Sequence, residues 1–577
     1  MRRLLRLVRR HPGLVGATAG LSALEAVLIV SIGPSRAAPL APQVAAPAPF
    51  GVFHDLRWLL VYHPSWLVFV VGLAALLGLR AVLDTALVRA AWPSGHPPPS
   101  WREQLVHAQR FTLITAGALA LFVVLTFAMA ATSLSWLFFV AVPVLVMVAL
   151  LVHHGEVLPT WWRDLPTRAT VVSILVVFVL LTGGGALISA VPAVVAPALA
   201  AVIGVGICLC RVCSVESLVT RSVDAPPIEG PRPRRRPYAV LGLAAVLVLV
   251  VGGTAIGFGV AVAVEAGRTP PPRVPRGATG SPVLVVKGFN SRWDGVTYRW
   301  VRGDHRIRRF SYRGLDARER PQTYAREDTH RGLLDLAREM RRQVAAFHEA
   351  TGEPVSIVAE SEGALVTQVY LAASPRAPVR AVVLLSPLAA PGRVYYPPPG
   401  EEGWGVASGT LMRGIAAVIG ALGPVDISAE EPVFRSMVDL GPMVGALLAC
   451  PPPRVRSFAV LPLDGGVSAP APIDVGFDHR VVPAFHGGLL GDDSTARAVE
   501  AVLDARRPEE GSAWWSAVGE TVNALAAPWQ APSLVPSLES TWRGLPDAGD
   551  CRAVRAELRR RTNGMPDARP TRRTASG

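Results

Sequence analysis

Long apolar stretches dominate the first half of the chain and restrict how it can fold. A helix needs about 20 mainly apolar residues to cross the hydrocarbon core of a bilayer, which is about 30 Å thick. Seven stretches meet this requirement, at residues 13–33, 58–80, 111–131, 133–152, 169–189, 191–210 and 238–264. The sequence therefore predicts an all-α bundle of about seven membrane spans over residues 1–265, with the lipid bilayer as its partner.

Arginine is distributed unevenly among the segments that join these stretches. With the N-terminus inside, the inner segments hold 17 arginines and the outer ones hold two, Arg36 and Arg57. Because cytoplasmic loops retain positive charge, this count predicts a cytoplasmic N-terminus and places everything after the seventh stretch outside the cytoplasm. The first stretch has the basic start of a signal peptide, but six more follow it, so we expect it to remain as a helix.

The net charge of +14 does not point to nucleic acid. A nucleic-acid site needs basic residues clustered on one folded face, together with aromatic or amide readers. Here the basic residues flank apolar stretches, and the chain is 51% hydrophobic with only 17% charged residues. No nucleic-acid partner is expected. Glu25 is the one ionisable residue predicted to lie deep in a span, and hydrogen bonding between helices accounts for it.

After residue 265 the sequence has the polarity of a soluble domain. Residues 266–282 are rich in Pro, Gly and Arg, which is typical of a linker. Runs of strand character and of helical periodicity then alternate over residues 283–562, and the five strands are SPVLVVKGFNS, RIRRFSYRG, PVSIVAE, VRAVVLLSP and RSFAVLPLD. This alternation predicts a mainly parallel sheet covered on both faces, with the active site at the carboxyl ends of the strands. Residues 563–577 are polar and basic and are predicted to be disordered.

An insertion at residues 391–450 separates the fourth and fifth strands. It contains two apolar helix candidates, GTLMRGIAAVIGALG and EPVFRSMVDLGPMVGALLA. A segment of this length within a compact domain is usually a functional lid, which is our prediction, and a packed structural excursion is the alternative.

Cysteine usage agrees with an extracytoplasmic domain. The second half contains two cysteines, Cys450 and Cys551, and outside the cytoplasm two thiols are expected to pair as a disulfide. Two separately buried thiols are the alternative. Cys208, Cys210 and Cys213 lie at the inner end of the sixth stretch without a fourth ligand or a histidine, so no metal site is predicted.

The stretch VSIVAESEGALVTQVYL places a serine where an apolar strand gives way to a helix. AESEG fits the G-x-S-x-G pattern of a nucleophile elbow, with Ala359 at the first glycine position. Such a turn holds the Ser361 hydroxyl clear of the sheet and directs the amide of Glu362 toward a developing oxyanion. The second amide would come from the loop KGFNS after the first strand, with Phe289 as the donor and Asn290 as the alternate.

A general base and an orienting acid are expected later in the chain. His486, in FHGGLL, follows the final strand and is predicted to be the base, with His479 as its only serious rival. Asp464 directly follows SFAVLPL and is predicted to be the acid that orients the imidazole. Asp474 and Asp478 are nearer to His486, but they lie in a loop and are read as solvated.

Two glutamates flank the serine. Glu360 is expected to point back into or beside the sheet, whereas Glu362 follows the serine and could line the pocket. We expect both carboxylates to be solvated or salt-bridged, because a negative charge near a developing oxyanion opposes catalysis unless it is directed away.

Residues 280–505 resemble the α/β-hydrolase family, with AESEG as the elbow, LDGG as the acid turn and HGGL as the histidine loop. The resemblance implies Ser361 as nucleophile, His486 as general base, Asp464 as orienting acid, and hydrolysis through an acyl-enzyme without a cofactor. The chain departs from the family pattern at Ala359 and lacks an oxyanion motif of the HGGG type.

The function predicted first is a membrane-tethered serine hydrolase that cleaves an ester, of a lipid or of an envelope acyl group, outside the cytoplasm. An acyltransferase is a variant of this prediction. The alternative is a non-catalytic, hydrolase-like domain through which a membrane protein binds or senses a ligand or partner. The presence of serine, acid and histidine in the expected order favours the enzyme.

Overall fold

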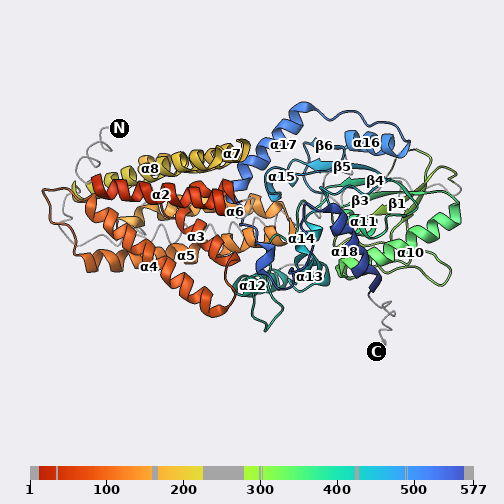
Figure 1. Cartoon of the computed structure of the whole chain (residues 1–577), viewed down its shortest axis with the longest axis horizontal. Helices are drawn as coiled ribbons and strands as arrows, with labels where there is room; N and C mark the ends of the chain where they lie inside the picture. Colours follow the sequence, from red (N-terminus) through yellow and green to blue (C-terminus); the bar gives the residue numbers. More distant parts are fainter. Residues whose placement is uncertain are drawn as a thin grey trace.

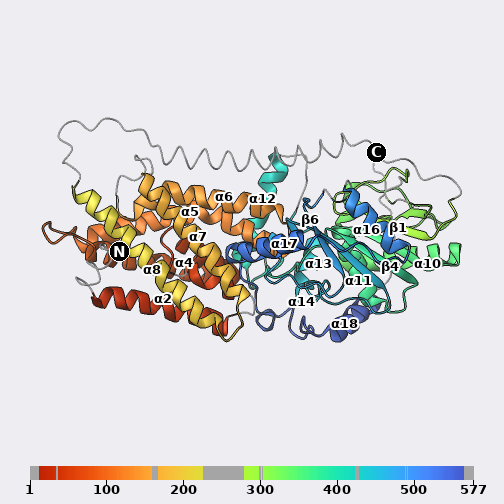
Figure 2. The ribbon, with the colours of Figure 1, turned by 90° about the horizontal axis from the view of Figure 1, so that it is seen from above.

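The computed structural model describes residues 12–33, 37–43, 45–158, 167–224, 278–297, 301, 303–422, 428–487, 489 and 492–564. A helical N-terminal half and an α/β C-terminal half lie end to end (Figures 1 and 2). The predicted span 238–264, most of the linker and nearly all of the predicted tail lie outside the described residues.

Helices make up the N-terminal half. In chain order they are α2 (Pro12–Ile32), η1 (Ala38–Gln43), α3 (Phe50–Val61), α4 (Trp66–Ala90), α5 (Trp101–Thr132), α6 (Trp136–Val152), η2 (His153–Glu156), α7 (Arg168–Ala190) and α8 (Ala196–Asp224). Among the described residues five helices, α4 to α8, are long and apolar enough to cross a membrane. The predicted helical bundle is present, with five such helices in the described part of the chain rather than seven.

The bounds predicted for the span 58–80 are wrong, because two helices share that stretch and the candidate span is α4. α3 ends at Val61, and α4 begins at Trp66. Pro64 between them has no amide hydrogen and disfavours helical geometry in the residue before it. Ser65 then caps α4 by accepting a hydrogen bond from the amide of Val68, at 3.3 Å. Hydropathy averaged over the stretch conceals this break.

Glu25 is not the only ionisable residue inside the bundle. Arg211 of α8 contacts Asp84 of α4 and lies 3.2 Å from Glu156 in η2. α4 and α8 extend beyond the predicted spans and so carry Asp84 and Arg211 within helices, which the apolar stretches alone do not indicate. Each charge faces a partner of opposite sign, which lowers the cost of placing them among apolar helices.

The C-terminal half is built on one parallel sheet of six strands in the order β2-β1-β3-β4-β5-β6. The strands are β1 (Pro282–Val286), β2 (Arg306–Arg309), β3 (Val355–Glu360), β4 (Val379–Leu385), β5 (Arg456–Pro462) and β6 (His479–Val482). All five predicted strands occur. β6 was missed because it is a short edge strand whose first residues are polar and partly exposed. Strand order reverses between β1 and β3, and such a reversal opens a crevice at the carboxyl ends of the strands.

Helices cover both faces of the sheet, as predicted. The helices of this half are η4 (Arg326–His330), α10 (Leu333–Thr351), α11 (Glu362–Ala373), α15 (Gly465–Ser468), α16 (Asp493–Leu503), α17 (Ala513–Ala526), η6 (Ala527–Trp529), η7 (Pro536–Leu538) and α18 (Cys551–Gly564). Side chains of α10, α11 and α18 form one apolar core with the sheet, and α16 forms a second core on the opposite face.

The insertion lies between the sheet and the helical bundle. Its helices are α12 (Val406–Leu422), α13 (Pro432–Asp439) and α14 (Gly441–Val444). α12 packs against α3, α4 and α5, and α13 packs against α5 and α10. The second helix candidate is broken between α13 and α14 because Pro442 cannot supply the amide hydrogen of a continuous helix.

A segment of the C-terminal half enters the bundle. We call residues 527–530 the anchor segment. Its Trp529 is buried among the aromatic rings of α3 and α7, and the indole Nε1 donates to Oγ1 of Thr182 at 3.0 Å. Arg57 of α3 is also buried and donates to the carbonyls of Pro528, at 2.6 Å, and Gln530, at 2.8 Å. The two halves therefore share one packed interior.

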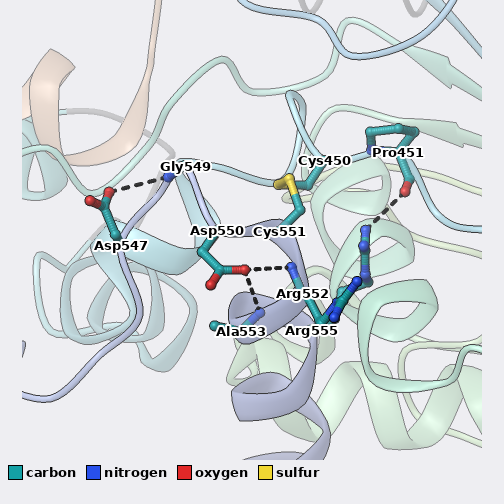
Figure 3. Close-up of a disulfide and its surroundings, with 9 residues drawn as sticks. All are labelled: Cys450, Pro451, Asp547, Gly549, Asp550, Cys551, Arg552, Ala553 and Arg555. Carbon is teal, nitrogen blue, oxygen red and sulfur yellow. Dashed lines mark hydrogen bonds between the residues drawn. A yellow bond between two sulfur atoms is a disulfide. The ribbon is translucent and has the colours of Figure 1, made fainter.

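Cys450 and Cys551 form a disulfide that joins the end of the insertion to the first residue of α18 (Figure 3). The carboxylate of Asp550 accepts hydrogen bonds from two amides in the first turn of α18. Arg555 donates to the carbonyl of Pro451 at 3.1 Å. These contacts fix α18 against the sheet beside α11.

Candidate active site

Ser361 lies in a sharp turn between β3 and α11. Its φ of 56° and ψ of −122° place it in a conformation that residues with side chains rarely adopt. A Cβ on Gly288 would lie 2.8 Å from the Cβ of Ser361, and one on Gly363 would lie 2.7 Å from the carbonyl oxygen of Lys287. Glycine at both positions lets the loop after β1 and the first turn of α11 close around the serine. Ala359 is fully buried within β3.

His486 lies beside Ser361, with its Nε2 2.8 Å from the serine Oγ. Its carbonyl accepts a hydrogen bond from the hydroxyl of Ser386, at the end of β4, at 2.7 Å. Burial lowers the pKa of His486 below its usual value, and the carboxylate of Asp464 only partly opposes this shift. The imidazole is therefore neutral near pH 7 and can accept the serine proton.

Asp464 follows β5 and is 4% exposed. Its Oδ2 accepts from the backbone amide of His486 at 3.2 Å and from the hydroxyl of Ser135 at 3.0 Å. Its Oδ1 is buried without a hydrogen-bond partner among the described residues. Burial raises the pKa of Asp464, whereas the hydrogen bonds from His486 and Ser135 lower it. The carboxylate holds the histidine loop through the backbone amide of His486, and no hydrogen bond joins these two described side chains to each other.

Ser135 belongs to the helical bundle, in the turn between α5 and α6. It occupies the N-cap position of α6, but its hydroxyl makes no capping hydrogen bond and donates to Asp464 instead. A serine cap typically contributes about 1 kcal/mol to a helix. That stabilisation is absent here, because the hydroxyl donates to a carboxylate on the other half of the protein.

Hydrogen bonds from α17 and from the anchor segment hold the turn after Asp464. Nδ2 of Asn523 donates to the carbonyls of Gly466, at 2.8 Å, and Ala469, at 2.9 Å. Nε2 of Gln530, in the anchor segment, donates to the carbonyls of Val467, at 2.9 Å, and Ala469, at 2.8 Å. Because the anchor segment is fixed in the bundle, the helical half positions the acid both directly and through this turn.

The loop after β1 supplies one of the two candidate oxyanion donors. The amide of Asn290, the alternate donor, donates to Oγ1 of Thr329 at 3.0 Å, which leaves the amide of Phe289 as the candidate. The second candidate is the amide of Glu362, which begins α11 and therefore has no acceptor within the helix.

Contacts from η4 and the insertion brace this loop. The ring of His330 stacks on that of Phe289 with centroids 4.5 Å apart, and its Nε2 lies 2.7 Å from Oδ1 of Asn290. Its Nδ1 lies 3.3 Å from a carboxylate oxygen of Glu431. Phe434 of α13 also packs against Phe289, with 5.1 Å between ring centroids. No local sequence pattern around His330 indicates this role.

The carboxyl groups of the two glutamates beside the serine lie in different environments. Glu360 forms an ion pair with Lys287, with 2.7 Å between Oε2 and Nζ. Glu362 is buried, and neither of its carboxyl oxygens has a hydrogen-bond partner among the described residues. The expectation of a solvated or salt-bridged carboxylate is therefore wrong for Glu362. Burial raises its pKa well above the usual value, which favours the uncharged form of this carboxyl group beside the serine.

The rival residues lie away from the site. Asp474 and Asp478 are exposed in the loop that precedes β6, and His479 is exposed at the first residue of that strand. All three are at the amino end of β6, whereas Ser361 and His486 meet at the carboxyl ends of the strands.

Within the described residues no cluster of His, Cys, Asp or Glu has three members placed to hold a metal ion. No protein-family model, no curated protein and no solved structure matches the chain. The functional assignment is therefore built on the geometry of this site.

Proposed function

We propose that the protein is a membrane-embedded serine hydrolase that cleaves an acyl ester outside the cytoplasm. The observation that carries this proposal is the 2.8 Å contact between Ser361 Oγ and His486 Nε2 at a turn where the serine has positive φ. A strained backbone conformation costs about 1–3 kcal/mol and is retained mainly at functional sites. A domain that only bound a ligand would not need a serine in this conformation, which favours the enzyme.

In the proposed reaction the Ser361 oxygen attacks the ester carbonyl carbon while its proton moves to Nε2 of His486. The carbonyl π electrons move to oxygen, and the amides of Phe289 and Glu362 donate to the resulting oxyanion. Collapse breaks the bond to the alcohol, which leaves with the proton from His486. Water then attacks the acyl-serine by the same steps and releases the acid. An alcohol in place of water would make the protein an acyltransferase.

The direction of the helices supports a seven-span topology. α8 ends at the end of the bundle remote from the α/β half, yet β1 lies in the α/β half (Figures 1 and 2). Between these two elements the sequence contains the apolar stretch 238–264, which is long enough for one further crossing. With α2 and the five long helices this makes seven crossings. The arginine distribution then favours a cytoplasmic N-terminus.

Labelling with a fluorophosphonate, which reacts with activated serines, tests the proposed chemistry. The full-length protein should be labelled, and Ser361→Ala should abolish the labelling. Ser457→Ala, at the amino end of β5 and thus at the opposite end of the sheet, is the matched control and should label like the wild type. Equal labelling of Ser361→Ala and wild type would exclude Ser361 as the nucleophile.

A phosphatase fused to the C-terminus, which is active only outside the cytoplasm, tests the topology. Activity is expected. A cytoplasm-specific reporter that is active at the same position would refute the extracytoplasmic placement of the α/β half.

A further inference from the structure

Two exposed aromatic side chains from the two halves of the protein meet beside His486. Phe485, the residue before it, is 71% exposed, and its ring centroid lies 6.2 Å from that of Phe139 of α6, which is 48% exposed. Trp136 lies one turn before Phe139 on the same helix and is also exposed. We call these three residues the aromatic rim. Exposed apolar surface at this scale marks a place where something apolar binds.

The aromatic rim is continuous with a surface that faces lipid. α6 is one of the five helices able to cross a membrane, and its exposed side chains would contact acyl chains there. Phe139 lies about 5 Å along the helix axis from Trp136, because each residue rises about 1.5 Å. Tryptophan is enriched at the boundary between head groups and acyl chains, which suits the first residue of a span. A bilayer that encloses α6 would therefore reach Phe139, and with it Phe485.

The candidate nucleophile, Ser361, is held close to the aromatic rim. His486 follows Phe485 directly, and its Nε2 contacts the Ser361 hydroxyl. Ser135, the residue before Trp136, donates to Asp464. The first turn of α6 thus touches the histidine loop through Phe139 and the acid through Ser135, so the end of the span and the reacting groups cannot move independently.

A lipid ester fits this arrangement. Its scissile carbonyl lies at the boundary between acyl chains and head groups, the depth at which the aromatic rim lies. We propose that the substrate is an acyl ester of a lipid in the outer leaflet, which moves laterally from the bilayer along α6 and past the aromatic rim to Ser361. The acyl chain would pack on Phe139 and Phe485 while the carbonyl reaches the amides of Phe289 and Glu362. This inference rests on the proposed serine hydrolase activity.

Two esters with the same leaving group distinguish substrate entry from the bilayer from the hydrolysis reaction itself. The full-length protein is placed in dioleoylphosphatidylcholine vesicles, and hydrolysis of methylumbelliferyl oleate, which partitions into the bilayer, is compared with that of the soluble methylumbelliferyl acetate. Each rate is divided by the fraction of protein that a fluorophosphonate labels, which corrects for inactive or misfolded protein.

The ratio of oleate to acetate turnover is expected to fall about tenfold in Phe139→Ser and in Phe485→Ser, because each loses the apolar contact of one aromatic side chain. Trp514→Ser is the matched control. Trp514 is 68% exposed and lies in the first turn of α17, the end of that helix farther from the bundle, so its ratio should equal that of the wild type.

An unchanged ratio in both Phe139→Ser and Phe485→Ser would overturn the inference, as would a wild-type protein that cleaves acetate but not oleate. Either result leaves the proposed hydrolase activity standing. A wild-type protein that is not labelled and cleaves neither ester would instead refute the proposed function itself.

Discussion

Removing the Ser135 hydroxyl tests whether the helical half takes part in catalysis. The hydroxyl donates to Oδ2 of Asp464 at 3.0 Å, and both side chains are buried. In Ser135→Ala that oxygen keeps one donor, the amide of His486. A hydrogen bond to a charged group is worth about 1.5–3 kcal/mol. If the whole amount is lost from the transition state, kcat falls about 10- to 150-fold, since about 1.4 kcal/mol corresponds to a factor of ten.

The same change should alter the pH dependence. The hydrogen bond from Ser135 lowers the pKa of Asp464, so deleting it raises that pKa and leaves less of the carboxylate ionised in mild acid. The acid limb of kcat should therefore move to higher pH, with KM for methylumbelliferyl acetate little changed because Ser135 does not touch the substrate.

Ser133→Ala is the control, since it removes a buried hydroxyl from the same turn that donates to the carbonyl of Ala389 and not to Asp464. Ser135→Thr keeps a hydroxyl and should recover part of the activity. If Ser135→Ala and Ser133→Ala have the same kcat and the same acid limb, the hydrogen bond to Asp464 has no catalytic role.

Three further predictions concern other parts of the structure. Because burial lowers the pKa of His486 and only its neutral form accepts the serine proton, kcat/KM should rise with pH to a plateau with a midpoint below the usual histidine value of about 6.5; a midpoint above that value would contradict the assignment. His330→Ala should slow fluorophosphonate labelling, because the side chain of Asn290 loses its partner and the oxyanion loop loosens, whereas labelling at the wild-type rate would show that the brace is dispensable. Cys551→Ser opens the disulfide to Cys450 across a separation of 101 residues and should lower the thermal midpoint, since by the chain-entropy account closure of such a loop stabilises by up to about 4–5 kcal/mol; an unchanged midpoint on thermal denaturation would refute this.

Features that depend on short stretches of neighbouring residues could be predicted from the sequence. The apolar stretches predicted a helical bundle, and alternating strands and helices predicted a parallel α/β sheet. Ser361, Asp464 and His486 each directly follow a strand or its loop, where short patterns carry the signal, and the structure places the first and last within hydrogen-bond distance. The short edge strand β6 was not predicted because it has four residues, of which the first two are polar and partly exposed, and this leaves almost no periodic signal.

Features that depend on contacts between distant segments were not accessible. Ser135 reads locally as an ordinary helix cap, and its hydroxyl is turned toward a carboxylate 329 residues away. The pairing of His330 with Glu431 requires the insertion to fold back over the oxyanion loop. Glu362 gives no sign of burial, since only the packing of α11 against the sheet removes its carboxyl group from water.

The position of Trp529 also sets the order in which the protein can be completed. It fills the space between α3 and α7 and bonds to Thr182, which precedes it by 347 residues. During synthesis these helices are made long before the tryptophan exists, so their interior stays unfilled until the chain has been extended to residue 529. Loss of a buried tryptophan typically costs about 3–5 kcal/mol, and a nascent bundle without Trp529 lacks that contribution throughout this interval. We expect chains truncated before residue 527 to turn over faster in pulse-chase labelling than full-length chains carrying Ser361→Ala, because the helical half becomes resistant to proteolysis only once the anchor segment has packed into it.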